Sequence, residues 1–517
     1  MKKLVGLLAV LTMSLPTFAA QYLVKYRNAQ TIQSFAASSQ MQILDVHEAG
    51  RLMTVEIPNS NKISAMVSLL TNPNVEYMVP NAKLHTFSNV PSDVTTSALK
   101  QQWAISKVHA TEAWAKAGNK GSRKIVVAVI DTGADSKHKS LSQNMIVGFD
   151  FIKNTSDTTD EVGQNPGHGT HCSGVIGATG LADGGTIGLS PEVSIMPIRF
   201  LDANGGGDLG NAVKSIDYAV EKKVDIISAS WGGAIPRPQA QPIIEAIQRA
   251  AKAGIIFVVA AGNDGQNNDS YEVFPANSGV DNMIVVAASD SNDAKPSWSD
   301  YGPGRVSIAS PGNEIMSTLP NDQYGNLSGT SMATPLVAGM VAFLKAQDSH
   351  LNAVQMRSLI QATGVPANIQ TACDCRVDAL QAVEAIKSQK MFVSPFGTTL
   401  EKGATQQFEG VYGKAPFTFT SSNAAVGKID GSGILTAVAD GETTVTVKDA
   451  SGVTATSHKI YVGAKSATPA KPVPGAPGGG GGLPGAPGGG GGAACPAGDQ
   501  ATCDALCAIM PAPWCKQ

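Results

Sequence analysis

The chain of 517 residues is too long for one hydrophobic core, so several domains are expected. Apolar residues make up 43% of it, as in an ordinary globular protein. Its 38 Lys and Arg residues nearly balance 41 Asp and Glu residues, which leaves a net charge of −3. This balance argues against a basic surface for nucleic acid or for an anionic membrane.

The first 20 residues have the pattern of an export signal. Lys2 and Lys3 precede an apolar run from Leu4 to Leu11 that is too short to span a bilayer. Small residues suited to cleavage follow at Thr17-Phe18-Ala19-Ala20. We therefore expect residues 1–20 to be a signal peptide and the protein to be secreted.

Residues 21–90 have the pattern of a small α+β unit. The expected elements are strands at 22–26, 52–57 and 75–79 and helices beginning at Ile32 and Ile63. The stretch from about 85 to 100 has no periodicity, and we expect an exposed connection there.

Residues 95–389 are expected to form the largest domain, with an α/β fold. Buried apolar runs alternate with helical stretches, a pattern that indicates a doubly wound, mostly parallel sheet covered on both faces. In such sheets the functional site lies at the C-terminal ends of the strands. The runs are Ile125–Ile130, Val193–Phe200, Val224–Ile227, Ile255–Ala260 and Met283–Ala287.

Three further segments follow. Residues 391–462 alternate with period two between recurrent turn signals, which predicts a C-terminal β-sandwich. Residues 463–494 are rich in Pro and Gly and predict a flexible linker. Residues 495–517 carry four of the seven Cys, whose pairing stays open among three arrangements. Cys172 is isolated in the sequence and is expected to be a free thiol.

Asp131 directly follows an apolar strand, in the sequence Ile130-Asp131-Thr132-Gly133. Asp-Thr-Gly is also the motif of aspartic proteases, in which two carboxylates share one proton. That interpretation needs a second such motif, and the sequence has none. Asp131 is therefore a candidate functional carboxylate of another type of site, at the C-terminal edge of the sheet.

His168 opens the sequence His168-Gly169-Thr170-His171 at a predicted helix start. An isolated His is usually structural, and His-x-x-His can also suggest metal ligands. Zinc-binding helices, however, use pairs spaced i, i+4 with an accompanying carboxylate. The sequence therefore argues against His168 as a metal ligand.

Ser331 lies in Gly329-Thr330-Ser331-Met332-Ala333, ahead of a helical run. A Ser at a helix start is most often a cap. Small neighbours leave this hydroxyl open, and free N–H groups at the helix start favour negative charge. Asn263 follows another buried strand, where an Asn amide either closes a turn or donates to an oxyanion.

Asp131, His168 and Ser331, in this order and together with Asn263, resemble the motifs of the subtilisin (S8, subtilase) family. The likeness covers about residues 101–389 and is greatest to proteinase K-like bacterial members. It implies a subtilisin fold and a serine endopeptidase that acts through an acyl-enzyme intermediate. The first three residues would form the catalytic triad, with Asn263 as the oxyanion donor.

The same resemblance implies that a substrate strand lies between two enzyme segments and next to Gly262. Trp231 stands where family members often carry Leu, so a larger aromatic wall is expected there. With no carboxylate in the motifs of the pocket, we expect a broad preference for apolar or aromatic side chains. The two segments are Gly205-Gly206-Gly207 and Ser230-Trp231-Gly232.

The flanking domains also resemble known families. Residues 21–90 resemble the inhibitor I9-type propeptide of subtilisins, which implies inhibition by the chain's own N-terminal unit and self-cleavage between about residues 84 and 100. Residues 391–462 resemble a bacterial Ig-like (Big2-type) module, which implies binding or spacing at a surface or polymer. The alternative function is a non-catalytic, cell-surface adhesion protein that retains a subtilisin fold.

The family resemblance also implies structural Ca²⁺, but none is required for the chemistry. A carboxylate ligand of the usual strong site falls at Ser140 in this sequence, which puts that site in doubt. The Asp-rich stretches 157–161 and 202–208 offer other carboxylates, although solvated surface charge is their usual role. Cys172 is expected to be a buried small side chain near His168, which predicts inhibition by mercurials. We expect a monomer whose partners are protein or peptide substrates.

Overall fold

The computed structural model describes residues 20–28, 41–58, 60, 62–87, 94–95, 102–180 and 184–463. The predicted signal peptide and the helix expected at Ile32 lie outside the described residues. So do the Cys-rich tail and, beyond residue 463, the Pro/Gly linker. Within the described part of the chain, no helix has both the length and the apolar character needed to cross a membrane.

The N-terminal unit is an antiparallel sheet with the strand order β2-β3-β1-β4. A helix packs on it, and the buried side chains of Met53, Val55, Ile57 and Leu69 form its core. The elements are β1 (Ala20–Tyr26), β2 (Gln42–His47), β3 (Leu52–Ile57), α3 (Lys62–Thr71) and β4 (Val75–Pro80). The strands predicted for this segment lie in β1, β3 and β4, whereas the sequence analysis missed β2.

The central sheet has nine strands, and all but the pair at one edge are parallel. Its strands are buried on both faces, as the continuous apolar runs predicted. In sheet order they are β18 (Val365–Pro366), β19 (Cys375–Arg376), β15 (Ile308–Pro311), β14 (Met283–Ser289), β13 (Ile256–Ala260), β11 (Ile226–Ala229), β7 (Val126–Asp131), β9 (Ser194–Arg199) and β8 (Phe149–Asp150).

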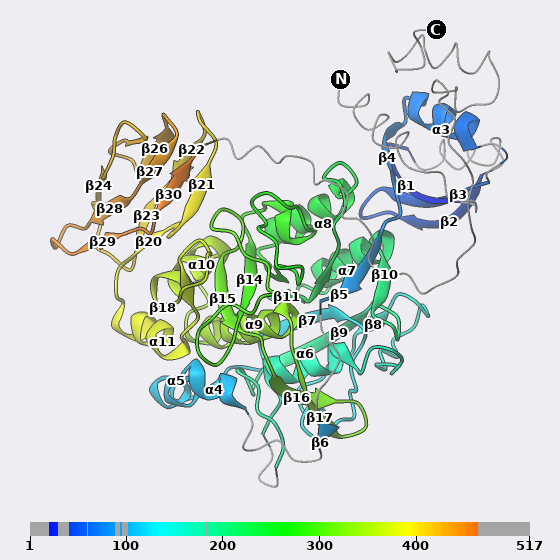
Figure 1. The fold of residues 1–517 in the computed structure, drawn as a ribbon, viewed down its shortest axis with the longest axis horizontal. Coiled ribbons are helices and arrows are strands. Elements are labelled where there is room, and N and C mark those ends of the chain that lie inside the picture. The colour runs from blue at the N-terminus through cyan, green and yellow to red at the C-terminus, as the bar shows by residue number, and fades with distance from the viewer. Residues whose placement is uncertain are drawn as a thin grey trace, which may run out of the picture.

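Helices cover both faces of this sheet (Figure 1). Helices α6 (His168–Gly177) and α9 (Thr330–Gln347) lie on one face, and α7 (Leu209–Glu221) and α8 (Gln241–Lys252) lie on the other. Alternate residues of β7 divide between the two cores: Val129 packs on the α6–α9 side and Ile130 on the α7–α8 side. The further helices are α4 (Trp103–Lys107), α5 (Ala110–Ala117), η2 (Ala276–Ser278), α10 (Ala353–Ala362) and α11 (Ala379–Ser388).

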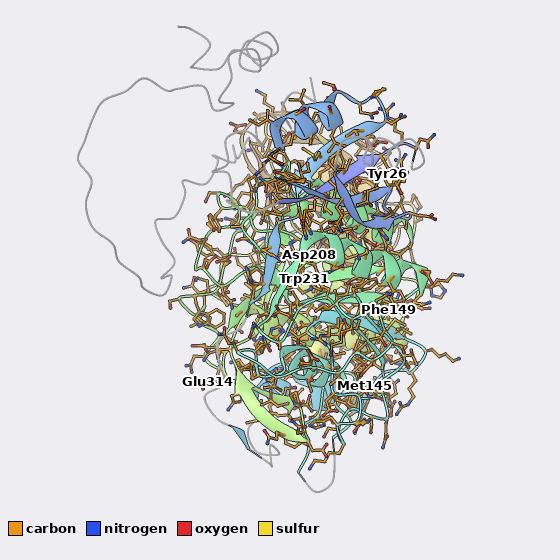
Figure 2. All side chains as sticks on the ribbon, turned by 90° about the vertical axis from the view of Figure 1, so that its right-hand side faces the viewer. Tyr26, Met145, Phe149, Asp208, Trp231 and Glu314 are labelled. Atoms are coloured by element: carbon orange, nitrogen blue, oxygen red, sulfur yellow. A yellow bond between two sulfur atoms is a disulfide. The ribbon has the colours of Figure 1, made fainter. Side chains whose placement is uncertain are left out.

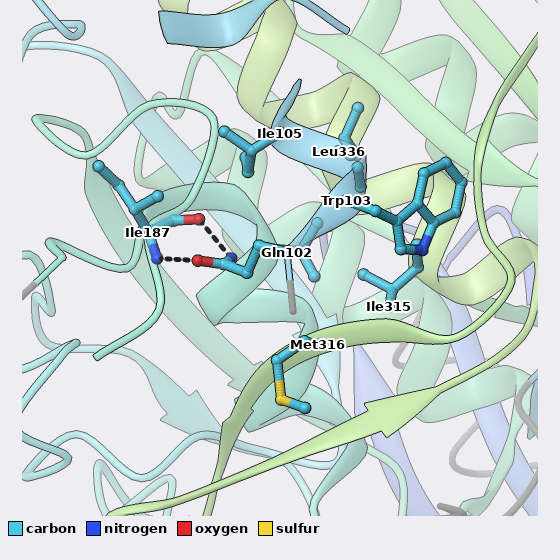
Figure 3. A pocket seen from close by; sticks show the side chains of 9 residues that line it. Gln102, Trp103, Ile105, Ile187, Ile315, Met316 and Leu336 are labelled. Atoms are coloured by element: carbon cyan, nitrogen blue, oxygen red, sulfur yellow. Dashed lines mark hydrogen bonds between the residues drawn. The ribbon is translucent and has the colours of Figure 1, made fainter. Parts of the chain in front are cut away.

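Two small sheets connect the N-terminal part to the large domain. In one, β5 (Lys83–Thr86) lies between β10 (Gly206–Asp208) and β12 (Trp231–Gly232). In the other, β6 (Val94–Thr95) adds to the hairpin of β16 (Ile315–Leu319) and β17 (Gln323–Leu327). Gln102 then anchors the chain, because its side-chain amide exchanges two hydrogen bonds with the backbone of Ile187 at 2.8 and 2.9 Å (Figure 3).

The C-terminal module is built from short strands around its own core, which includes Phe408, Leu435, Val445 and Val447. It packs on the large domain next to α10, where the Tyr412 hydroxyl donates to Asp348 over 2.8 Å. Its strands are β20 (Phe392–Ser394), β21 (Thr398–Leu400), β22 (Thr405–Gln407), β23 (Glu409–Val411), β24 (Thr418–Ser421), β25 (Gly427–Ile429), β26 (Ile434–Ala437), β27 (Gly441–Thr443), β28 (Val445–Lys448), β29 (Thr454–Thr456) and β30 (Ile460–Val462).

Candidate active site

Three elements bring the predicted catalytic side chains to one edge of the central sheet. Asp131 ends β7, His168 begins α6, and Ser331 is the second residue of α9. Helix α6 can approach β7 closely because Gly169 has no side chain: a Cβ there would lie 2.1 Å from the carbonyl oxygen of Gly133. The three side chains therefore meet at the C-terminal ends of the strands, as the sequence analysis expected.

Asp131 and His168 form a buried pair. The Nδ1–H of His168 donates to Oδ1 of Asp131 over 2.7 Å, and both side chains are almost inaccessible to solvent. Burial disfavours the charged imidazolium, but the Asp131 carboxylate outweighs this effect and holds the pKa of His168 well above its usual value. In this geometry the carboxylate fixes the tautomer of the imidazole and leaves Nε2 to accept a proton.

The Ser331 hydroxyl contacts the cleft in which β5 lies. It donates to the carbonyl oxygen of Ser230 over 2.8 Å and accepts from the backbone N–H of Phe87 over 3.1 Å. Among the described residues, Nε2 of His168 has no hydrogen-bond partner. Proton transfer to His168 therefore requires the hydroxyl to turn away from Ser230.

The Asn263 amide is held in one orientation. Its Oδ1 accepts from the backbone N–H of Thr330 over 3.0 Å and from the Thr330 hydroxyl over 2.9 Å. Its Nδ2 is thereby directed into the cleft, where it donates to the carbonyl oxygen of Phe87 over 2.8 Å. A donor fixed next to a carbonyl oxygen is the arrangement that stabilises an oxyanion.

The chain's own residues fill the predicted substrate cleft. Strand β5 pairs antiparallel with both segments: His85 lies opposite Gly206 and Gly232, and Thr86 lies opposite Trp231. Figure 2 shows Asp208 of β10 and Trp231 of β12 beside this strand. The backbone N–H of Thr86 also donates to the carbonyl of Gly205 over 3.0 Å. This is the β-augmentation expected for a substrate.

Glycine at position 232 makes room for the ring of Phe87. A Cβ on Gly232 would lie 2.7 Å from Cζ of Phe87 and 2.6 Å from the carbonyl oxygen of Phe274. Three residues earlier, Leu84 is fully buried in the core on the α7–α8 side. The cleft therefore holds an aromatic side chain at the residue whose carbonyl Asn263 contacts, and an apolar side chain further along the same strand.

Comparison with known proteins shows the family to which the chain belongs. The model of the subtilase family (peptidase S8) matches residues 122–407, and that of the bacterial Ig-like domain (group 2) matches residues 388–460. Thermitase from Thermoactinomyces vulgaris is 37% identical over 263 residues, which cover 51% of this chain and 88% of thermitase. This chain is a subtilase.

One further relative supports the assignment, and a solved structure supports the fold. A thermostable alkaline protease from Halalkalibacterium halodurans is 33% identical over 361 residues, which cover 69% of this chain and 90% of that protease. The solved structure of fervidolysin from Fervidobacterium pennivorans, a keratinolytic enzyme related to subtilisin, covers 84% of this chain and 72% of fervidolysin, with a TM-score of 0.60. Because only 20% of residues are identical, fervidolysin supports the fold alone. The predicted α/β fold with its mostly parallel sheet is confirmed, as is the Ig-like module.

Trp231 corrects one expectation about the cleft of this subtilase. Its backbone pairs with Thr86 of the chain itself, and its indole does not form an exposed aromatic wall. The ring is fully buried, donates from Nε1 to the carbonyl of Ile130 over 2.7 Å and packs edge-on against Phe200. The alternation of side chains along a strand sends this one into the core.

The residues of the subtilase do not fit a cation at the doubtful calcium position. Ser140 is buried, and its hydroxyl shares a 2.8 Å hydrogen bond with the Tyr324 hydroxyl. In the two Asp-rich stretches, Asp160 accepts from Thr170, and Asp202 accepts from the backbone of its own loop. These contacts favour structural roles for the carboxylates.

Asp131, His168 and Cys172 form the one cluster of candidate metal-ligand atoms found in the described ranges, with all three within 4.8 Å of one another. Burial raises the pKa of the Cys172 thiol and so opposes the thiolate that binds metals. Its Sγ lies 3.9 Å from Nδ1 of His168. Cys172 is thus a buried free thiol beside His168, and inhibition by mercurials stays a prediction.

Three residues that support this site were not predicted. Asn165 accepts from the backbone N–H groups of Gly167 and His168 and so holds the turn that leads into α6. Thr330 orients Asn263, and Asp300 holds the loop that carries Asn263. An Asn three residues before His168 is a turn signal that the sequence offers. No sequence pattern marks Asp300, because only the fold brings it to the loop.

Proposed function

We propose that this subtilase is a secreted serine endopeptidase that first cuts its own chain between Phe87 and Ser88. The observation that carries the proposal is the position of the Phe87 carbonyl. Asn263 donates to its oxygen over 2.8 Å, while the N–H of the same residue contacts the Ser331 hydroxyl. These two contacts of Phe87 support the bond after it as the one that the chain cuts first.

Each group has one task in the proposed reaction. Oγ of Ser331 attacks the Phe87 carbonyl carbon while Nε2 of His168 takes the hydroxyl proton. Asp131 stabilises the imidazolium, and Asn263 stabilises the oxyanion. His168 then gives its proton to the departing amine, and water hydrolyses the acyl-enzyme by the same steps. The subtilase reaction needs no cofactor.

The residues that fill the cleft also support a preference for particular substrate side chains. An aromatic ring lies against Gly232 and a leucine side chain is buried three residues upstream, whereas His85 between them is exposed. We infer a preference for an aromatic or large apolar residue before the cut bond and for an apolar residue three positions earlier. This narrows the broad apolar preference that the sequence suggested.

The N-terminal unit is proposed to act as an I9-type inhibitor until it leaves. Downstream of the cut, β6 pairs with β17 and Gln102 is bound to Ile187, which supports retention of this side on the protease. Secretion rests on the signal-like residues 1–20. Attachment to a surface or polymer is proposed for the Ig-like module.

The test compares the parent with Ser331→Ala in the full chain. The parent is expected to yield a fragment that ends at Phe87, as identified by mass spectrometry, and to react with a fluorophosphonate probe. Ser331→Ala should stay uncleaved, with a loss in kcat on the order of 10⁶ against peptide substrates. A variant that still matures, or a parent that never reacts with the probe, would favour the alternative of a non-catalytic adhesion protein.

A further inference from the structure

A cavity of about 230 Å³ lies where the Ig-like module meets the peptidase domain. The peptidase domain contributes residues between 276 and 285, from η2 to β14, the segment 303–307, residues of α10, and Ala372. The module contributes β21 and Gln406. Polar groups dominate the surface of this cavity, which is unusual for a contact between two domains that simply exclude water.

Two arginines line this interdomain cavity, and neither forms an ion pair with a described residue. Arg305 lies beside Gly279, with Nη1 3.4 Å from the position of a Cβ there. The Nη1 of Arg357 donates to the carbonyls of Asp281 and Met283, over 3.1 and 2.8 Å. These two bonds fix one edge of the guanidinium and leave its other N–H groups available.

The charge around the cavity is positive on balance. Asp281 also lines it, but its carboxylate forms no ion pair with Arg357. Burial lowers the pKa of Arg357, and the charge of Asp281 only partly opposes this effect. Arg357 is partly exposed at the cavity, and a guanidinium without a paired carboxylate is a group that an external anion would stabilise.

Two buried polar atoms on the cavity walls also lack partners. Gln361 is only 3% exposed: its Nε2 donates to the carbonyl of Ser307 over 2.9 Å, but its Oε1 has no partner within the described ranges. The hydroxyl of Thr399, from the opposite wall, has none either. Both atoms are buried within the walls, and the Gln361 oxygen can only accept a hydrogen bond, so binding of an anion here depends on the two guanidinium groups.

We propose that this interdomain cavity binds a small oxyanion, the carboxylate or sulfate group of a ligand, through Arg305 and Arg357. Guanidinium groups suit this role because their fixed N–H fork matches two oxygens of one anion. The volume admits one charged group or a single acidic sugar, but not a folded chain. Because its walls come from two domains, a bound anion would also stabilise the docking of the module. The site is separate from the catalytic triad.

The experiment uses full-length Ser331→Ala protein, which cannot digest itself if the proposed function is correct. Isothermal titration with sodium sulfate and with sodium glucuronate, at ionic strength held constant with chloride, is expected to show saturable binding. Glucose should not bind. Arg305→Gln should weaken the binding about tenfold, which is about 1.4 kcal/mol. The exposed Arg123, which bonds to the carbonyl of Gln143, provides the matched control Arg123→Gln.

Comparing the two anions distinguishes an acidic sugar from a free oxyanion as the ligand. Stronger binding of glucuronate assigns the site to an acidic sugar, and equal binding assigns it to a free oxyanion. Arg305→Lys keeps the charge but loses the fork, so it should fall between the parent and Arg305→Gln. Absence of saturable binding, or equal affinities in the parent and in a correctly folded Arg305→Gln, would overturn the proposal.

Discussion

Asp300 holds the loop that carries Asn263, the proposed oxyanion donor. Its Oδ1 accepts from the backbone N–H groups of Asp264 and Gln266, over 3.0 and 2.8 Å. Gly262 is required beside it, because a Cβ there would lie 2.1 Å from Oδ2 of Asp300 and because its φ is +124°. Burial, reinforced by the charge of Asp264, raises the pKa of Asp300 to about 7 although the two N–H groups oppose the shift. Asn263 is therefore carried on a loop whose support titrates near neutral pH.

The pKa of Asp300 predicts a pH dependence of stability. An unfolded Asp titrates near pH 4, so the folded protein holds this proton more tightly. The stability that it contributes is complete below about pH 4 and is lost as the pH rises through about 7. Asp300→Asn keeps the Oδ1 acceptor and removes the charge. Measured by thermal unfolding in the Ser331→Ala background, its stability relative to the parent should rise between pH 5 and pH 8, by on the order of 2 kcal/mol. A difference that stays constant with pH would contradict this account.

At the scale of elements, three strands assemble the cleft. Strands β10 and β12 present glycine backbone to β5 from both sides, and α6 and α9 bring His168 and Ser331 to its end. Each strand is short, but together they fix the register that places Phe87 at Asn263. We therefore expect the specificity of the cleft to depend on strand pairing as well as on pocket side chains.

Gly232→Ala tests this view of the cleft. The added Cβ would overlap the aromatic ring bound there, so kcat/KM for peptides with Phe before the cut bond should fall. We expect about tenfold more loss than for matched peptides with Ala, equivalent to about 1.4 kcal/mol. The Cβ also approaches the Phe274 carbonyl, which lowers stability. The ratio between the two substrates cancels that effect, and an unchanged ratio would show that Phe87 does not mark the specificity pocket.

At the scale of the whole molecule, the N-terminal unit lies on α7 and α8 through charged contacts. Lys25, which is 5% exposed, pairs with Glu245 at 2.8 Å, and the Tyr77 hydroxyl donates to the same carboxylate. His47 contacts Asp217 at 2.6 Å, and Arg249 donates to Asp217 from two nitrogens. These contacts lie away from the catalytic groups, so they can set how tightly the unit is held after the cut.

Glu245→Gln should therefore shorten the delay before activity appears. It leaves the buried Lys25 ammonium without its anion, and removing one partner of a buried pair is destabilising. We expect release of the unit to become about tenfold faster, or about 1.4 kcal/mol. Activity against a fluorogenic peptide measures the lag, and gel electrophoresis reports the cut separately. Glu221→Gln, which affects an exposed pair with Lys222, is the matched control. Equal lags in the two variants would exclude a holding role for Glu245.

The sequence alone determined the fold class and the identity of the candidate catalytic groups. Period and length of the apolar runs give a parallel sheet, and residues at strand ends and helix starts must meet at one edge because parallel strands end together. The tertiary structure alone decided which peptide bond lies at those groups, since Phe87 reaches Asn263 only through pairing between segments distant in sequence. It also turned Trp231 inward, brought Asp300 to its loop and formed the interdomain cavity. Local patterns specify which face of an element is buried, but not which distant element covers it.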